Sequence, residues 1–145
     1  MPLKIQTVDV WATQLLDHPG DLGRVLTALA NAGANVECVI ARRQEEKPGT
    51  GVVFVSPIKG KKVIDAAELA GMQPATNLGT LRVESADKPG LGAKMCSAIS
   101  DAGINLKGVS AAVIGNKSVV YLGFDSPEDA KRAVKALKGI DRRKR

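Results

Sequence analysis

The chain has 145 residues, a hydrophobic fraction of 44% and a formal net charge of +6 at pH 7. This length and apolar content suffice for one packed domain of ordinary size or for two minimal ones, which excludes an intrinsically disordered protein. The sequence opens MPLKIQTVDV and has no apolar run near 18 residues, so we expect no secretory signal, no membrane helix and a cytoplasmic location.

The rare residue types exclude several kinds of site. Cys38 and Cys96 form no Cys-x-x-Cys pair and His18 is the single histidine, so we expect reduced thiols and no metal site. Residues 138–145 hold five basic residues and one acidic residue, or +4 of the total +6, and we interpret them as a solvated terminus. The aromatic content of 3% is too low for base stacking, so nucleic acid is not an expected partner. No phosphate-binding glycine motif is present, and we expect no cofactor.

The first half of the chain contains, in order, the signals of three strands and two helices. Residues 8–16 alternate in polarity as a half-buried strand does, and they stop at an Asp-x-Pro-Gly turn. The next segment, residues 20–33, places apolar side chains at helical spacing and ends at a glycine suited to a left-handed cap. A hairpin of residues 36–43 and 51–56 follows, and then a second helix over residues 59–70.

The second half repeats this order. A strand over residues 78–85 runs into another Asp-x-Pro-Gly turn and a helix, and a hairpin then turns tightly at Gly115-Asn116. The last helix covers residues 127–138. Ser126 is a good N-cap for it, with proline at the first helical position and acidic residues in the first turn.

The two halves are copies of each other. DHPGDLGRVLTALANAGANV, residues 17–36, aligns without a gap with DKPGLGAKMCSAISDAGINL, residues 87–106, and seven of the twenty pairs are identical. The identities include the Asp-x-Pro-Gly of each turn and the Ala-Gly-x-Asn of each helix exit. The similarity resumes after a shorter hairpin, where GVVFVS at 51–56 matches SVVYLG at 118–123. This pattern indicates internal duplication.

Two copies of Asp-x-Pro-Gly opening a helix that ends Ala-Gly-x-Asn resemble the ACT domain, a small regulatory module of amino-acid metabolism, over nearly the whole chain. The second copy, GLGAKMCSAISDAGINLKGVS, is similar to the regulatory half of aspartokinases, without a kinase portion. As a whole the chain resembles free-standing tandem-ACT proteins. It departs from the family at Gly92, where a large apolar residue is usual, and at the last strand of the second copy, which would fall on the charged residues 140–145.

The pattern predicts an α+β chain of two ferredoxin-like βαββαβ units, residues 1–76 and 77–145, with the break near residues 72–78. We expect the units to pack side by side into one continuous antiparallel sheet with the helices on one face. Fused units of this kind still expose sheet edges and helix faces, which predicts a homodimer or a larger assembly.

The repeated turns have the chemistry to hold a free amino acid. A helix N-terminus offers unpaired N–H groups and partial positive charge to a carboxylate, and Asp17 or Asp87 can accept a hydrogen bond from the ammonium group. The two aspartates have a second interpretation as caps of the turn. Asn35 and Asn105 likewise either contact a ligand or satisfy backbone groups at the helix exit.

Residues 20–33 span fourteen helical positions, which separates Asp17 from Asn35 by roughly 20 Å, so one small ligand cannot touch both. The resemblance to ACT pairs implies a ligand in the seam between two units, where Asp17 would approach Asn105 and Asp87 would approach Asn35. The departures in the second copy favour the helix start after Asp17 as the stronger carboxylate receptor. The candidate ligand-binding residues are Asp17, Gly20, Asp21, Leu22, Gly23, Asn35, Val36, Asp87, Gly90, Leu91, Gly92, Asn105 and Leu106.

These observations predict a non-catalytic regulatory or sensor module. Its expected partners are a free amino acid, a second copy of the chain, and a regulated enzyme or regulator, with no membrane. No catalytic group stands out, because His18 is replaced by Lys88 in the second copy and Glu45 and Glu46 lie in a hairpin loop without a partner. The alternative is a ligand-free protein–protein interaction scaffold whose seam is empty. An RNA-binding module shares the topology but would need the missing aromatic residues.

Overall fold

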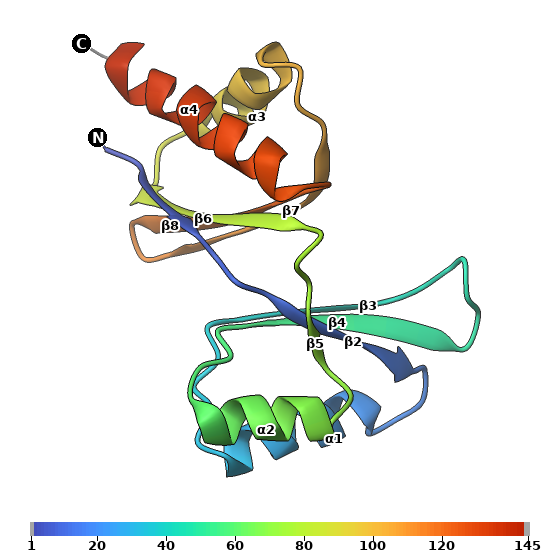
Figure 1. Cartoon of the computed structure of the whole chain (residues 1–145). Helices are drawn as coiled ribbons and strands as arrows, with labels where there is room; N and C mark the ends of the chain where they lie inside the picture. The colour runs from blue at the N-terminus through green and yellow to red at the C-terminus, as the bar shows by residue number, and fades with distance from the viewer. Residues whose placement is uncertain (1, 144–145) are drawn as a thin grey trace. The chain divides into compact units, whose positions relative to one another are not determined.

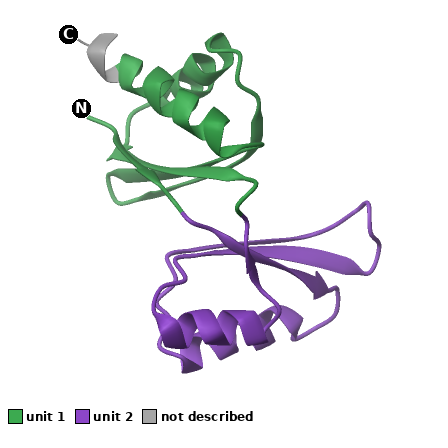
Figure 2. Ribbon diagram, viewed as in Figure 1, with its two compact units in different colours: residues 1–8, 76–145 green, residues 9–75 purple. Residues whose placement is uncertain are grey.

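The computed structural model describes residues 2–143, with side chains described through residue 140. The chain folds into two compact units, coloured separately in Figure 2. Unit 2 is the continuous segment Asp9–Ala75, and unit 1 combines Met1–Val8 with Thr76–Arg145. Unit 2 is therefore inserted into the sequence of unit 1. No helix within the described residues is both long and apolar enough to cross a membrane.

Unit 2 is a four-stranded antiparallel sheet covered on one face by two helices (Figure 1). Its elements are β2 (Trp11–Leu16), α1 (Asp21–Asn31), β3 (Cys38–Arg43), β4 (Thr50–Ser56), α2 (Lys61–Leu69) and β5 (Gln73–Pro74). The strand order is β3-β4-β2-β5. Val25 and Leu29 of α1 pack in one core with Val53 and Val55 of β4, and all four side chains are buried. The alternation of β4 and the helical spacing of α1 place these apolar side chains between the two layers.

Unit 1 has the same architecture and the order β1-β6-β8-β7. Its elements are β1 (Lys4–Thr7), β6 (Gly79–Ala86), α3 (Leu91–Asp101), β7 (Leu106–Ile114), β8 (Lys117–Phe124) and α4 (Pro127–Arg143). Met95 and Ile99 of α3 pack in its core with Leu81 of β6 and Leu122 of β8. Each unit is thus a ferredoxin-like sandwich, as the sequence predicts, and the α+β fold class is confirmed.

The local signals that end or begin helices are confirmed. Gly33 and Gly103, just after α1 and α3, have positive φ angles of 89° and 75°, which other residues rarely adopt. Ser126 caps α4, since its Oγ accepts a hydrogen bond from the backbone N–H of Asp129 at 3.1 Å.

The N-terminal strand lies in the unit of the second copy. In β1, Lys4 pairs with Glu84 and Thr7 with Leu81, so β1 forms the edge of the sheet beside β6 (Figure 1). The expected boundaries, 1–76 and 77–145, had grouped this segment with the first copy. The difference arises because β1 supplies the fourth strand that the second copy lacks.

The expected last strand over residues 140–145 is wrong for the described part of that segment. Helix α4 continues to Arg143 and residues 144 and 145 lie outside the described residues. Ala130, Ala133, Leu137 and Ile140 recur at helical spacing and are all buried, so the helix gains core contacts through its last turns.

Within residues 2–143 the strand ladders form two sheets of four strands, not the one continuous sheet expected from the sequence. In unit 2, β3 is an edge strand whose ladder joins it only to β4, and in unit 1, β7 is an edge strand whose ladder joins it only to β8. The backbone groups on the outer sides of β3 and β7 are therefore not used in either ladder.

Candidate functional site

The two Asp-x-Pro-Gly turns are built alike. The backbone N–H of Asp17 donates to the carbonyl of Gly49 at 3.0 Å, and that of Asp87 donates to the carbonyl of Asn116 at 2.8 Å, so each turn is fastened to the hairpin of its own unit. Gly20 and Gly90 precede the helices with φ angles of 95° and 82°. This left-handed conformation favours glycine and directs the chain into the helix.

Neither helix start is capped by a side chain, since no side-chain hydrogen bond is made by the N-cap residues Gly20 and Gly90. The first N–H groups of a helix have no carbonyl partner in the helix itself. Asp17 and Asp87 therefore do not cap α1 and α3, and the interpretation of these aspartates as helix caps finds no support.

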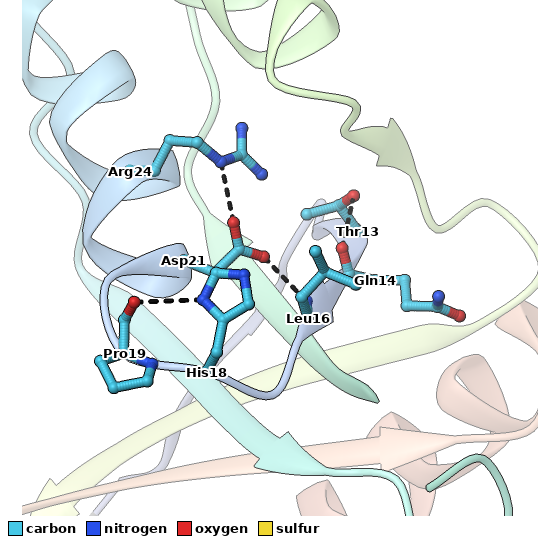
Figure 3. Close-up of polar contacts among 7 residues, drawn as sticks. All are labelled: Thr13, Gln14, Leu16, His18, Pro19, Asp21 and Arg24. Carbon is cyan, nitrogen blue, oxygen red and sulfur yellow. Dashed lines mark hydrogen bonds and ion pairs between the residues drawn. The ribbon is translucent and has the colours of Figure 1, made fainter. Parts of the chain in front are cut away.

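At the start of α1 the carboxylate of Asp21 is buried and fully engaged (Figure 3). Its Oδ2 accepts a hydrogen bond from the backbone N–H of Leu16 at 2.8 Å, and its Oδ1 accepts one from Arg24 Nε at 2.9 Å. The hydrogen bond from Leu16, and then that from Arg24, hold the pKa of Asp21 below its ordinary value. A fixed negative charge therefore occupies the first turn of α1.

The second carboxylate at this turn is also paired. Arg43 at the end of β3 lies with its Nε 3.0 Å from Asp17 Oδ2 and 3.2 Å from Oδ1. The pair is exposed, with 81% of the arginine side chain accessible, so it contributes little to stability. It does occupy the aspartate that the sequence suggests as an acceptor for an ammonium group.

The start of α3 differs in both respects. Leu91 stands where the first copy has Asp21, and α3 has no acidic residue in its first turn. By strand register, Val113 opposite Ser118 occupies the place of Arg43 opposite Gly51. Asp87 therefore lacks the arginine that pairs with Asp17, and its exposed carboxylate makes no hydrogen bond or ion pair within the described residues.

The two asparagines lie beyond the far ends of the helices. The orphan carbonyls there are satisfied by the backbone, because Ala34 N–H donates to Leu29 and Ile104 N–H donates to Ile99. Asn35 and Asn105 are exposed, and neither side chain forms a hydrogen bond in the part of the chain that the structure describes. Their role as partners of the helix exit therefore finds no support.

Within unit 2, α1 separates the two groups of candidates. The helix has eleven residues and is about 16 Å long, so Asp17, Gly20, Asp21, Leu22 and Gly23 gather at one end while Asn35 and Val36 lie past the other. Unit 1 repeats this arrangement along α3. The exposed candidates are Asp17, Gly20, Gly23, Asn35, Asp87, Gly90, Gly92 and Asn105; Leu22, Val36 and Leu106 are half-buried, and Asp21 and Leu91 are buried.

A polar cluster on the sheet of unit 1 escaped the sequence analysis. Arg82 Nη1 donates to Tyr121 Oη at 2.9 Å, and Arg82 Nη2 donates to Glu84 Oε1 at 3.2 Å. Lys4 of β1 lies 3.6 Å from the same glutamate. The hydrogen bond from Arg82 holds the pKa of Glu84 below its ordinary value. The cluster ties β1, β6 and β8 together, and its only sequence signal was the polar alternation of β6.

No group of three His, Cys, Asp or Glu side chains that could hold a metal ion occurs among the described residues. The chemistry on offer is instead that of helix-end N–H groups, carboxylates and exposed amides. Such groups bind small polar ligands by hydrogen bonds and charge.

No sequence profile of a known protein family matches the chain, and no curated protein matches it by sequence. Solved structures do match. Protein BT0572 from Bacteroides thetaiotaomicron superposes with a TM-score of 0.77 at 15% identity, over 94% of this chain and 90% of that chain. The regulatory subunit of aspartate kinase from Thermus thermophilus, in its ligand-free form, gives 0.64 at 19% identity, over 94% and 95%. The regulatory subunit from Thermus flavus gives 0.62 at 18% identity, over 96% of each chain.

The chain therefore has the fold of two ferredoxin-like ACT units in tandem. It shares this fold, along nearly its whole length, with the regulatory subunits of aspartate kinases.

Proposed function

We propose that the chain is a non-catalytic regulatory module that senses a free amino acid. The observation that carries the proposal is the start of α3, where uncapped N–H groups lie beside the exposed and unpaired carboxylate of Asp87. A free amino acid needs both kinds of partner, donors for its carboxylate and an acceptor for its ammonium group. The likeness to regulatory subunits of aspartate kinases supports a role in regulation.

The contacts favour α3 over α1 as the receptor for the ligand carboxylate. At α1, the buried Asp21 places negative charge in the turn where the ligand's negative charge would sit, and Arg43 already pairs with Asp17. At α3, Leu91 and Val113 replace Asp21 and Arg43, so the helix end keeps its partial positive charge and Asp87 is available. This assignment reverses the preference for the first copy that the sequence suggests.

One helix start supplies only part of a site, because Asn105 lies at the far end of the same helix as Asp87. We propose that Asn35 and Val36, from the exit of the other copy, complete the site around Asp87, Gly90 and Gly92, with the ligand in the seam between two ACT units. Binding would then stabilise one arrangement of the units and pass the signal to the chain's own homodimer or to a regulated enzyme.

The experiment is a thermal-shift panel of the ordinary L-amino acids, beginning with lysine and threonine because of the likeness to aspartokinase regulatory regions. At a hundred times Kd, linkage adds about 2.7 kcal/mol to the stability of the folded state, so the Tm should rise by about 5 to 10 °C. No shift with any amino acid at millimolar concentration would instead favour the ligand-free interaction scaffold.

The two turns provide a matched pair of variants. Asp87→Ala should reduce the shift strongly, since it removes the acceptor for the ammonium group. Asp17→Ala removes the same side chain from a turn where it already pairs with Arg43, and it should leave the shift largely intact. The opposite ranking would move the site to α1.

A further inference from the structure

Four strands form the edges of the two sheets within the described residues, and three of them carry features that discourage pairing with another chain. β1 has four residues and carries Lys4, β5 has two residues and ends in Pro74, and β3 ends in Arg42 and Arg43. β7 has nine residues, and its only charged side chain is Lys107, near its beginning. It is the one long, uncharged edge among the four.

The surface of β7 is apolar as well as uncharged. Val109 is 48% exposed, Val113 52% and Ile114 76%. Val109 lies opposite the buried Leu122 of β8, so its side chain is on the face of the sheet that the helices cover, yet half of it remains accessible. This edge therefore has both unused backbone groups and uncovered apolar side chains.

The duplication provides an internal comparison. By strand register, Ala112 and Val113 of β7 stand where β3 has Arg42 and Arg43. The same strand in the same fold is thus protected by charge in one copy and left unprotected in the other. Two arginines on β3 show that the fold tolerates charge at these positions, so their absence from β7 is not required by the packing of the unit.

We propose that β7 pairs antiparallel with β7 of a second copy of this chain, about a two-fold axis at Ala111. The strand is regular from Gly108 to Ile114, after an irregularity between Leu106 and Gly108, and Ala111 is its middle residue. This register places Val109 opposite the second copy's Val113, and it does so twice. Helices of both copies then lie on the same side of one eight-stranded sheet.

A second copy fits this edge because the strand is complementary to itself. Pairing about the two-fold axis joins valine to valine and brings no like charges together, whereas each charged edge would repel its own copy. The closed arrangement also leaves no further β7 edge exposed, so assembly stops at the dimer.

The mass of the protein in solution tests the interface. The wild-type chain, without amino acids, should sediment at twice the chain mass of 15.2 kDa. Val113→Arg gives β7 the residue that β3 has at this position, and it should raise the dissociation constant of the dimer at least about tenfold. Leu69→Arg, at a 90% exposed apolar residue of α2, is the matched control and should leave the mass unchanged. A wild-type monomer, or a Val113→Arg variant of unchanged mass, would overturn the proposal.

Loss of folding does not confuse this test, because Arg43 fits the same position beside Asp17 in unit 2. A second variant gives a positive signal: Ala111→Cys, at the two-fold axis, should form a covalent dimer on mild oxidation, while Leu69→Cys and the wild type should not. Absence of the covalent dimer would count against the proposed register and axis. Amino-acid binding by a chain that stays monomeric would overturn this interface and leave the proposed function standing.

Discussion

Asp21 and Leu91 occupy the same position in the first turn of the two repeated helices, and both are buried, at 8% and 6% exposure, but only Asp21 carries a charge. The N–H of Leu16 and the guanidinium of Arg24 compensate that charge in unit 2. The two copies have therefore kept one backbone while acquiring different electrostatics at the helix starts. This difference decides which copy can receive an anionic group.

The hydrogen bonds to Asp21 predict a specific response to acid. Because they lower its pKa from the ordinary value of about 3.9, the unfolded chain takes up a proton at this residue at a higher pH than the folded chain does. The stability that this carboxylate contributes is present above that value and is lost as the pH falls below it. We expect the Tm of the wild type to fall more steeply between about pH 5 and pH 3 than the Tm of Asp21→Asn.

The control for this acid response is Asp101→Asn, which makes the same change in charge on the exposed surface of α3. It should keep the steep loss of the wild type. Equal slopes for the wild type and Asp21→Asn would show that the network around Asp21 does not contribute to the acid response.

A close backbone approach at Gly79 predicts a large effect of one methyl group. A Cβ at this position would lie 2.6 Å from the carbonyl oxygen of Ser126 and 2.7 Å from Cβ of Ala130, at the start of α4. Gly79→Ala should therefore lower the free energy of unfolding by about 1 to 3 kcal/mol. Gly123→Ala, where the nearest atom is an ordinary 3.6 Å away, should cost clearly less in the same urea titration.

The pairing of β1 with β6 predicts that the N-terminus stabilises the second repeat. Removal of residues 1–8 would expose the edge of β6 and uncover the core that Leu3 and Ile5 pack against. Hydrogen exchange should then become faster in β6 and β8, while α1 and β4 of unit 2 keep their protection. Uniform loss of protection in both units would contradict this division of the chain.

The basic C-terminus is the comparison for that truncation. Residues 142–145 follow Ile140, the last residue of the buried face of α4. Removing them should change the free energy of unfolding by about half a kcal/mol or less, as surface changes usually do. A loss of several degrees in Tm would show that these residues contribute to the fold.

The proposed seam predicts which residues act together on one ligand. In a double-mutant cycle on amino-acid affinity, Asp87→Ala and Asn35→Ala should be coupled, because they contact one ligand in the proposal. Asp87→Ala and Asn105→Ala should be additive, since the length of α3 separates them and distant sites usually add. Coupling within one copy would exclude the proposed pairing of the helix start with the exit of the other copy.

The parts of the fold that the sequence predicts are those set by neighbouring residues. The turn at Gly115, the glycine after α1 and the Ser126 cap each depend on a few adjacent positions, and all are as expected. The strand β1 was missed because it has four residues, and its partner β6 lies beyond an entire inserted unit. No local pattern reports a pairing of that kind.

The candidate site shows the same limit. The duplication reveals both turns, so their aspartates and glycines could be named from the sequence. The difference in their partners could not, because the pair of Asp17 with Arg43 joins a turn to the far end of a hairpin. That Val113 takes the place of this arginine follows only from the strand register.

The insertion of Asp9–Ala75 into unit 1 has a consequence for biosynthesis. β1 leaves the ribosome among the first residues, but its partner β6 is made only after the whole of unit 2 has emerged. Unit 2 can therefore fold during translation while β1 waits without a sheet, and unit 1 closes only when the chain is nearly complete. Synonymous codons that slow the ribosome after residue 75 would lengthen that wait without altering any residue of the protein.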